Sequence, residues 1–154
     1  MCAIVTKGTV EQIMSDKRLI SFDEIVETFS YLDSWEERYG YVMELGAQLK
    51  PLEEHLKRDE FKVRGCASQV WMIPSYQDGH VTWQADSDAL VVKGLIYLLL
   101  SFIQDRSSDD ITRDAIFKAF ERLELQSQLS AQRANGFASM VQRIETDMRR
   151  FRLQ

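Results

Sequence analysis

The chain has 154 residues, of which 45% are hydrophobic, and its formal net charge at pH 7 is −5. This length and apolar content predict one compact domain with a core of its own. Because a negatively charged protein repels nucleic-acid phosphates and anionic lipid, we expect neither nucleic acid nor a membrane surface as a partner.

Cysteine content and hydropathy predict the cellular compartment of the protein. Its two cysteines, Cys2 and Cys66, are too few for a secreted disulfide scaffold, so a reducing cytoplasm is the expected location. The first residues lack an apolar core behind a basic start, and we expect no targeting segment. The most apolar stretch, 89–103, contains Lys93 and is shorter than the roughly 20 residues that span a bilayer, which favours a buried helix.

Two stretches lack a sustained apolar period. Residues 1–20 are expected to be a poorly determined N-terminal lead-in, and residues 21–154 to form a single domain. Residues 51–61 are mostly charged, which is typical of an exposed connection or a short helical turn.

Two helices are predicted directly after the lead-in. Ser21 with Glu24, and Ser34 with Glu37, have the spacing of capping boxes, and apolar residues at helical spacing follow each pair. The second helix must end before Pro51, because the residue preceding a proline disfavours helical backbone.

A β-hairpin is predicted next. Residues 70–73 are β-branched and aromatic in bias, and residues 81–85 alternate between apolar and polar, which is typical of two paired antiparallel strands. Asp78-Gly79 supplies a turn that tolerates positive φ, and Pro74 indicates an edge or a bulge where the first strand ends.

The second half of the chain is predicted to be helical. Asp-Ser-Asp at 86–88 places capping oxygens before the stretch 89–103, which is apolar nearly all round and is predicted to be the central core helix. Further helices are expected around 115–123 and from about Ser130. Helices, then strands, then helices indicate an α+β domain with a small antiparallel sheet covered by helices.

The stretch 62–72, KVRGCASQVWM, sets Cys66 between a basic glycine turn and an apolar run. Cys66 is open to three interpretations: an inert buried residue, a metal ligand or a nucleophile. Lys62 and Arg64 would lower the pKa of the thiol, and Gly65 permits a turn, while the apolar run offers shelter to a modified sulfur. Against this, free cysteine often behaves as a small buried hydrophobe.

The other potential metal ligands and the catalytic motifs of the chain exclude some interpretations of Cys66 but do not decide among the rest. Cys2, His55, Cys66 and His80 are the soft or imidazole ligands of the chain, and they lack the close spacing of zinc or iron–sulfur sites, so no metal site is predicted. No protease signature surrounds Cys66, and no phosphate-binding glycine motif occurs. Residue types alone leave Cys66 as either a core residue or a nucleophile.

Six short motifs lie in order along the chain. They are W-E-E-R-Y at 35–39, E-L-G at 44–46, G-C-x-S-Q-V-W at 65–71, D-S-D-A at 86–89, V-K-G-L at 92–95 and L-S-x-x-R-x-x-G at 129–136. Together they resemble the SufE family of cysteine desulfuration proteins. The departures are minor: Ala67 stands where glutamine or glutamate is common, and Ala134-Asn135 replace a frequent Ser-Gln.

The resemblance implies a SufE/IscU-like fold and makes Cys66 the sulfur acceptor. Proteins of this family take the terminal sulfur of a persulfide from a pyridoxal-phosphate cysteine desulfurase, stimulate that enzyme, and pass the sulfur toward iron–sulfur cluster assembly. The implied partners are therefore a cysteine desulfurase and a downstream scaffold complex, with no cofactor bound by this chain and an oligomeric state left open. The alternatives are an iron–sulfur cluster scaffold and a non-catalytic interaction module of the same pathway.

The resemblance also implies residues that support the partner contact or the cysteine loop. They are Arg64, Ser68, Gln69, Asp86, Asp88 and Arg133. The guanidinium fork of Arg133 suits a carboxylate, although a surface or capping role is an alternative. Helix capping is likewise an alternative for Asp86 and Asp88.

Overall fold

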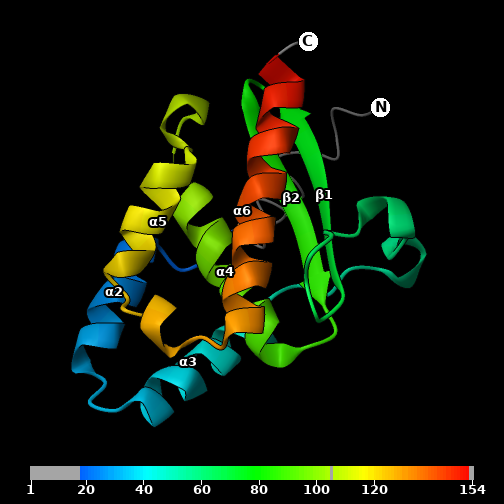
Figure 1. The fold of residues 1–154 in the computed structure, drawn as a ribbon. Helices are drawn as coiled ribbons and strands as arrows, with labels where there is room; N and C mark the ends of the chain where they lie inside the picture. The colour runs from blue at the N-terminus through cyan, green and yellow to red at the C-terminus, as the bar shows by residue number, and fades with distance from the viewer. Residues whose placement is uncertain (1–17, 105, 153–154) are drawn as a thin grey trace, which may run out of the picture.

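The computed structural model describes residues 18–104 and 106–152 (Figure 1). Its α-helices in this part of the chain are α2 (Phe22–Tyr31), α3 (Trp35–Gln48), α4 (Leu90–Ile103), α5 (Arg113–Glu121) and α6 (Ala131–Arg152), and its strands are β1 (Val70–Gln77) and β2 (His80–Ser87). The predicted α+β class, a small antiparallel sheet with helices, is confirmed. Most of the predicted lead-in, residues 1–17, lies outside the described residues.

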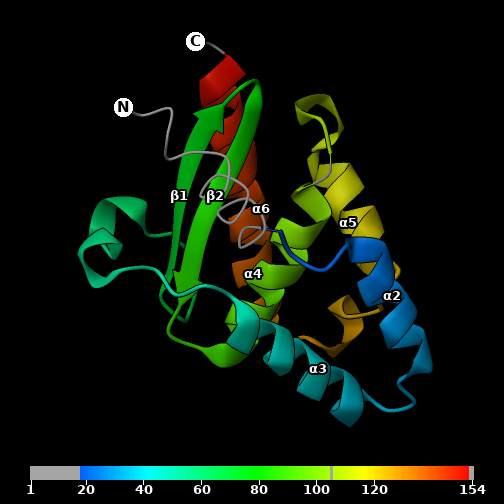
Figure 2. The same cartoon turned by 180° about the vertical axis from the view of Figure 1, so that it is seen from behind.

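The apolar helix α4 lies at the centre of the fold. Figures 1 and 2 show α2, α3 and α5 on one side of it and the β-hairpin with α6 on the other. Ten of its fourteen residues are buried, as expected for a helix that is apolar nearly all round. Within residues 18–104 and 106–152, no helix combines the length and hydropathy needed to cross a membrane.

Both predicted helix starts in the first half of the chain are confirmed. Ser21 Oγ accepts a hydrogen bond from Glu24 N at 3.2 Å, and Ser34 Oγ accepts one from Glu37 N at 3.1 Å. These bonds satisfy backbone donors that the first helical turn leaves free. Helix α3 ends at Gln48, before Pro51, and the connection that follows contains two short 3₁₀ turns, Glu54–Leu56 and Asp59–Phe61.

The β-hairpin is longer and more regular than predicted. Asp78 and Gly79 both have positive φ, 52° and 80°, which is the conformation of a tight two-residue hairpin turn. The register is unbroken from Val70↔Ser87 to Gln77↔His80, so Pro74 lies inside the strand and no bulge forms there. In a two-stranded sheet each strand has an open edge, and the missing N–H of proline is tolerated.

The capping role expected for residues 86–88 is wrong. The N-cap of α4 is Ala89, and no side chain caps it. Strand β2 continues through Ser87, which holds Asp86 opposite Trp71 in the β-ladder instead of at the end of the helix. The Asp86 and Asp88 carboxylates bind other groups, described below.

Two glycines allow α3 and α4 to cross closely. A Cβ atom on Gly46 would lie 2.5 Å from Leu90 O and 2.8 Å from Gly94 N. A Cβ atom on Gly94 would clash in the same way with the carbonyl of Val42. Because these neighbours are backbone atoms of the facing helix, a methyl group at either position would push the helices apart. The close packing of α3 on α4 therefore explains the glycines of the E-L-G and V-K-G-L motifs.

Replacement of Gly46 by alanine is expected to destabilise the protein by roughly 1–3 kcal/mol, the usual cost of overpacking, even though alanine is the better helix former. Gly40 lies in the same helix, and a Cβ atom there would meet nothing within 4 Å. Gly40→Ala is therefore the matched control and is expected to stabilise by up to about 1 kcal/mol. Urea unfolding of both variants measures the difference, and equal effects would contradict the close crossing.

Candidate functional site

Cys66 lies in a loop, residues 64–69, that is closed at its base. Val63 N donates to Val70 O at 2.9 Å, and Lys62 forms a bridge with Trp71. The two chain segments that enter and leave the loop are thus paired before β1 begins. We refer to residues 64–69 as the cysteine loop.

A glycine turn presses the cysteine loop against α6. Gly65 has φ +89°, a conformation that side-chain-bearing residues rarely adopt, so the expected glycine turn is confirmed. A Cβ atom here would also lie 2.5 Å from the hydroxyl of Ser139. On the same helix, a Cβ atom on Gly136 would lie 3.5 Å from Cys66 Sγ. The cysteine loop therefore packs directly on α6, and a side chain at position 65 would clash with Ser139.

Cys66 is half-buried beside a cavity of about 320 Å³. Its Sγ donates a long hydrogen bond, 3.5 Å, to Gly136 O. The lining of the cavity includes the apolar residues Val70, Val92, Leu95 and Met140 and the polar residues Ser68, Ser130, Gln132 and Arg133. An atom bonded to Sγ would therefore find space with apolar walls next to it.

Burial raises the pKa of the Cys66 thiol above its ordinary value. The expectation that Lys62 and Arg64 lower this pKa is therefore wrong for the resting structure. Lys62 Nζ lies 3.3 Å from Asp59 Oδ1, and Arg64 is exposed to solvent, which screens its charge. At rest the sulfur is held as the thiol, which is the less reactive form.

Gln69 and Asp88 tie the end of the cysteine loop to the residues before α4. Gln69 N donates to Asp88 Oδ1 at 3.0 Å, and Asp88 N donates to Gln69 O at 3.3 Å. A third, longer contact of 3.5 Å joins Gln69 Nε2 to Asp88 Oδ2. Both residues are exposed, so this pairing is open to solvent and to a partner.

Asp86 is buried and organises a different region. Oδ2 accepts a hydrogen bond from Leu52 N at 2.9 Å, and Oδ1 accepts one from Ser87 N at 2.8 Å. Lys57 and Lys93 lie 3.7 and 3.5 Å from this carboxylate. With 1% of its surface exposed, Asp86 joins the connection after α3 to β2 and α4.

The structure brings some of the predicted site residues together and separates others. Cys66, Ser68 and Arg133 all line the same cavity. Arg133 is exposed, and its backbone N donates to Ser130 Oγ at 3.2 Å in the first turn of α6. Arg64 is on the exposed side of the loop.

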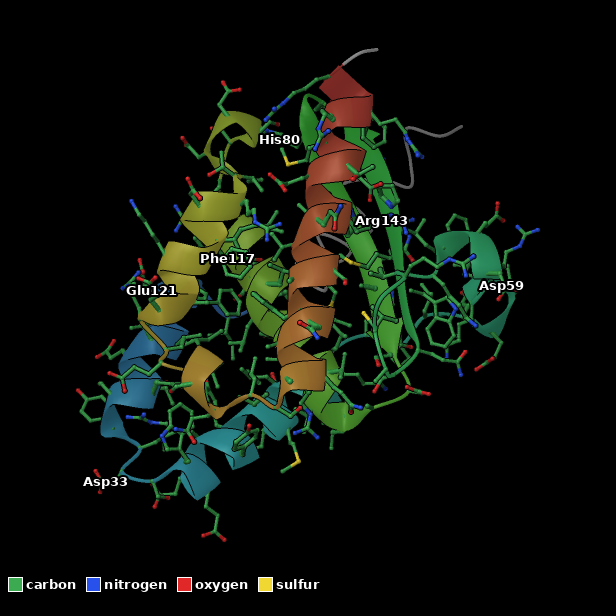
Figure 3. All side chains as sticks on the ribbon, in the orientation of Figure 1. Asp33, Asp59, His80, Phe117, Glu121 and Arg143 are labelled. Atoms are coloured by element: carbon green, nitrogen blue, oxygen red, sulfur yellow. The ribbon has the colours of Figure 1, made fainter. Side chains whose placement is uncertain are left out.

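Two charged residues of α6 near the hairpin were not predicted. Asp147 is 1% exposed, and its carboxylate accepts hydrogen bonds from Trp83 Nε1 at 2.9 Å and from Arg143 Nε at 3.3 Å. Figure 3 shows Arg143 on the side of α6 that faces the hairpin. Asp147 lies among the buried residues of α6, which include Ile144 and Met148. A carboxylate at a buried helical position is the sequence signal that could have identified it.

Neither histidine is among the residues that line the cavity beside Cys66. His55 Nδ1 is 3.3 Å from Glu53 Oε2 on the exposed connection, and His80 is exposed at the hairpin turn (Figure 3). Among the residues that the structure describes, no three histidine, cysteine, aspartate or glutamate side chains gather as a metal site. Cys2 lies outside the described residues.

The fold and the site define an α+β protein with a half-buried thiol on a short loop beside a cavity. The sequence model of the SufE family, described as an Fe-S metabolism associated domain, matches residues 23–148. The chain belongs to the SufE family, which confirms the resemblance of its motifs.

Relatives agree with this assignment. An uncharacterized SufE-like protein of Rhizobium meliloti (strain 1021) is 39% identical over 133 residues, which are 84% of this chain and 95% of that protein. Another, from Rhizobium etli, is 39% identical over 134 residues, which are 84% of this chain and 90% of that protein. The solution structure of a hypothetical protein from Thermus thermophilus has the same fold, with a TM-score of 0.67 at 17% identity, and the match covers 86% of this chain and 96% of that one.

Proposed function

We propose that this protein is a sulfur acceptor that takes persulfide sulfur from a pyridoxal-phosphate cysteine desulfurase onto Cys66. It thereby stimulates the desulfurase, and it passes the sulfur to an iron–sulfur scaffold complex in the cytoplasm. The observation that carries the proposal is the placement of Cys66, a half-buried thiol on a short loop beside the 320 Å³ cavity. Membership of a family associated with Fe–S metabolism supports the same conclusion.

The reaction is a thiol exchange at sulfur. The Cys66 thiolate attacks the outer sulfur of the desulfurase persulfide, a new S–S bond forms at Cys66, and the desulfurase cysteine leaves as a thiolate. The proton of the persulfide stays with the transferred sulfur or passes to solvent, and no net oxidation occurs. The exchange needs one thiolate and one persulfide, and it needs no cofactor bound by this chain.

The cavity suits the product of this exchange. Its volume of about 320 Å³ far exceeds the roughly 30 Å³ that one water molecule occupies in the liquid. A second sulfur bonded to Sγ therefore fits in this cavity, whose lining includes the apolar side chains of Val92, Leu95 and Met140. There it is sheltered from thiols in solution, which would otherwise remove it.

The attack itself requires the cysteine loop to move. In the resting structure Sγ faces Gly136 O, and burial keeps it protonated by raising its pKa. Displacement of the loop by the desulfurase would expose the sulfur and return its pKa toward the ordinary value, so that activation depends on the partner.

Mass spectrometry of the intact protein and of its peptides tests the proposal directly. The protein is incubated with its desulfurase and cysteine without reductant, and the mass of one additional sulfur atom is expected on the peptide that contains Cys66. Cys66→Ser is expected to lose both the adduct and the stimulation of desulfurase turnover. If no adduct forms and Cys66→Ser stimulates turnover as well as the natural protein does, the protein is an interaction module instead.

Reconstitution separates the scaffold alternative from sulfur transfer. The protein is incubated anaerobically with iron and sulfide and then desalted. A sulfur acceptor is expected to remain colourless and to retain no iron. Visible cluster absorbance that persists after desalting and disappears in Cys66→Ser would support a scaffold.

A further inference from the structure

One arginine of α6 reaches both ends of the cysteine loop. Arg143 Nη1 lies 3.1 Å from Lys62 O, and Nη2 lies 3.3 Å from Met72 O. Lys62 precedes the loop and Met72 follows it, so a single guanidinium joins the two segments from which the loop projects. The Arg143 side chain is 22% exposed and lies between α6 and the hairpin (Figure 3).

A buried carboxylate orients this guanidinium. Asp147 lies one helical turn after Arg143 and accepts Nε at 3.3 Å, while its other oxygen accepts Trp83 Nε1 at 2.9 Å. A carboxylate that is 1% exposed is tolerated when it is paired and hydrogen-bonded. The three side chains therefore form one unit that connects α6 with β2 and with the base of the cysteine loop.

The contacts at the base of the loop differ in kind from those that hold residues 64–69 themselves. At the base, the hydrogen bonds of Arg143 are charge-assisted and partly withdrawn from solvent, which strengthens them. The loop itself is held at its last residue by the exposed Gln69–Asp88 pairing and at Cys66 by the long Sγ hydrogen bond to Gly136 O. A partner can therefore release residues 64–69 while the base stays in place.

We infer that Arg143 is a positioning residue for Cys66, because it fixes both ends of the cysteine loop and limits the opening movement to residues 64–69. Arg143 is not among the residues that line the cavity, and its hydrogen bonds go to Asp147, Lys62 O and Met72 O, so it acts through the loop. The consequence for sulfur transfer rests on the proposed function, whereas the consequence for the resting position of Cys66 does not.

Lysine cannot replace arginine in this role. A guanidinium is planar and presents donors in several fixed directions, and here its three nitrogens reach Asp147, Lys62 O and Met72 O. A lysine ammonium is a single point on a flexible stem, so it can remain near Asp147 but cannot join both carbonyls. Arg143→Lys therefore keeps the charge pair and releases the base of the loop.

Alkylation of Cys66 by iodoacetamide tests the inference in a Cys2→Ser background, where Cys66 is the one remaining cysteine. Arg143→Lys is expected to raise the alkylation rate at pH 7 about tenfold, given the usual strength of hydrogen bonds to a charged group. The midpoint of the rate against pH is expected to move down toward that of the unfolded chain. Arg150→Lys changes an exposed arginine of the same helix and is expected to alter neither quantity.

Amide hydrogen exchange distinguishes local positioning from general stability. In Arg143→Lys, exchange is expected to accelerate in residues 62–72 and to stay unchanged in α4 and α5. Asp147→Asn, which keeps an acceptor for Trp83 and removes the charge that orients Arg143, is expected to show the same local pattern. Unchanged alkylation in Arg143→Lys, faster exchange throughout the chain, or loss of folding in both variants would overturn the inference.

Sulfur transfer is measured on the same variants to keep this inference apart from the proposed function. If Cys66 of the natural protein accepts no sulfur, the proposed function fails, and the alkylation and exchange results still decide the role of Arg143. If sulfur transfer occurs, Arg143→Lys is expected to lower the maximal rate at saturating protein more than it changes the half-saturating concentration, because Arg143 positions Cys66 and does not form the contact surface.

Discussion

At pH 7, Cys66 of the folded protein is expected to react with iodoacetamide more slowly than the same cysteine in urea, and its rate is expected to rise through a midpoint at higher pH. The reason is that burial raises the pKa of the Cys66 thiol, while the thiolate is the species that attacks. Alkylation quenched at a series of times, followed by peptide mass spectrometry, measures the rate against pH for the folded protein and for the protein in urea. The protein in urea serves as the reference for an unburied thiol.

The same shift has a defined sign for stability. Because the folded state favours the thiol form, its contribution to stability is fully present below the pKa of the unfolded chain and is lost as pH rises through the pKa of the folded protein. Alkaline conditions should therefore favour exposure of Cys66. A midpoint for the folded protein at or below the one in urea would show that Cys66 is an activated thiol at rest, contrary to its burial.

Replacement of Asp86 by asparagine is expected to destabilise the protein by roughly 1–3 kcal/mol, the cost of leaving a buried hydrogen-bond donor without an acceptor. Both carboxylate oxygens accept backbone N–H groups, from Leu52 and Ser87. The amide nitrogen of asparagine would face one of these donors and leave it without an acceptor. Lys57 and Lys93 would also lose their shared negative charge.

Asp59→Asn is the matched control for this substitution. Asp59 also pairs with a lysine, Lys62, at 3.3 Å, but its side chain is 90% exposed. Exposed pairs contribute about 0–1 kcal/mol, so this variant should unfold near the same urea concentration as the natural protein. If both substitutions had similarly small effects, Asp86 would not hold the connection after α3 in place.

The local elements were predictable because short-range chemistry decides them. Ser21 and Ser34 satisfy backbone donors three residues away, and Asp78-Gly79 adopts a turn that other dipeptides resist. The stretch 89–103 is too apolar to lie anywhere except in the core. Gly65 was likewise identifiable, since its turn depends on its own backbone.

The roles of the charged residues were not predictable in the same way. Asp86, Ser87 and Asp88 have the composition of a helix cap, yet β2 extends through Ser87 and directs the two carboxylates elsewhere. Their partners, Leu52 and Gln69, come from distant parts of the chain. Sequence spacing carries no information about such contacts.

Cys66 shows most clearly which properties the sequence determines and which ones the tertiary structure decides. The sequence by itself determined that a cysteine follows a glycine turn and precedes an apolar strand, and its motifs identified the family. The tertiary structure decided the state of the thiol, because burial beside α6 outweighs the charges of Lys62 and Arg64 in setting its pKa. Arg143 reaches the base of the cysteine loop because α6 packs on the hairpin. These segments are far apart in the chain, and no local sequence pattern specifies their contact.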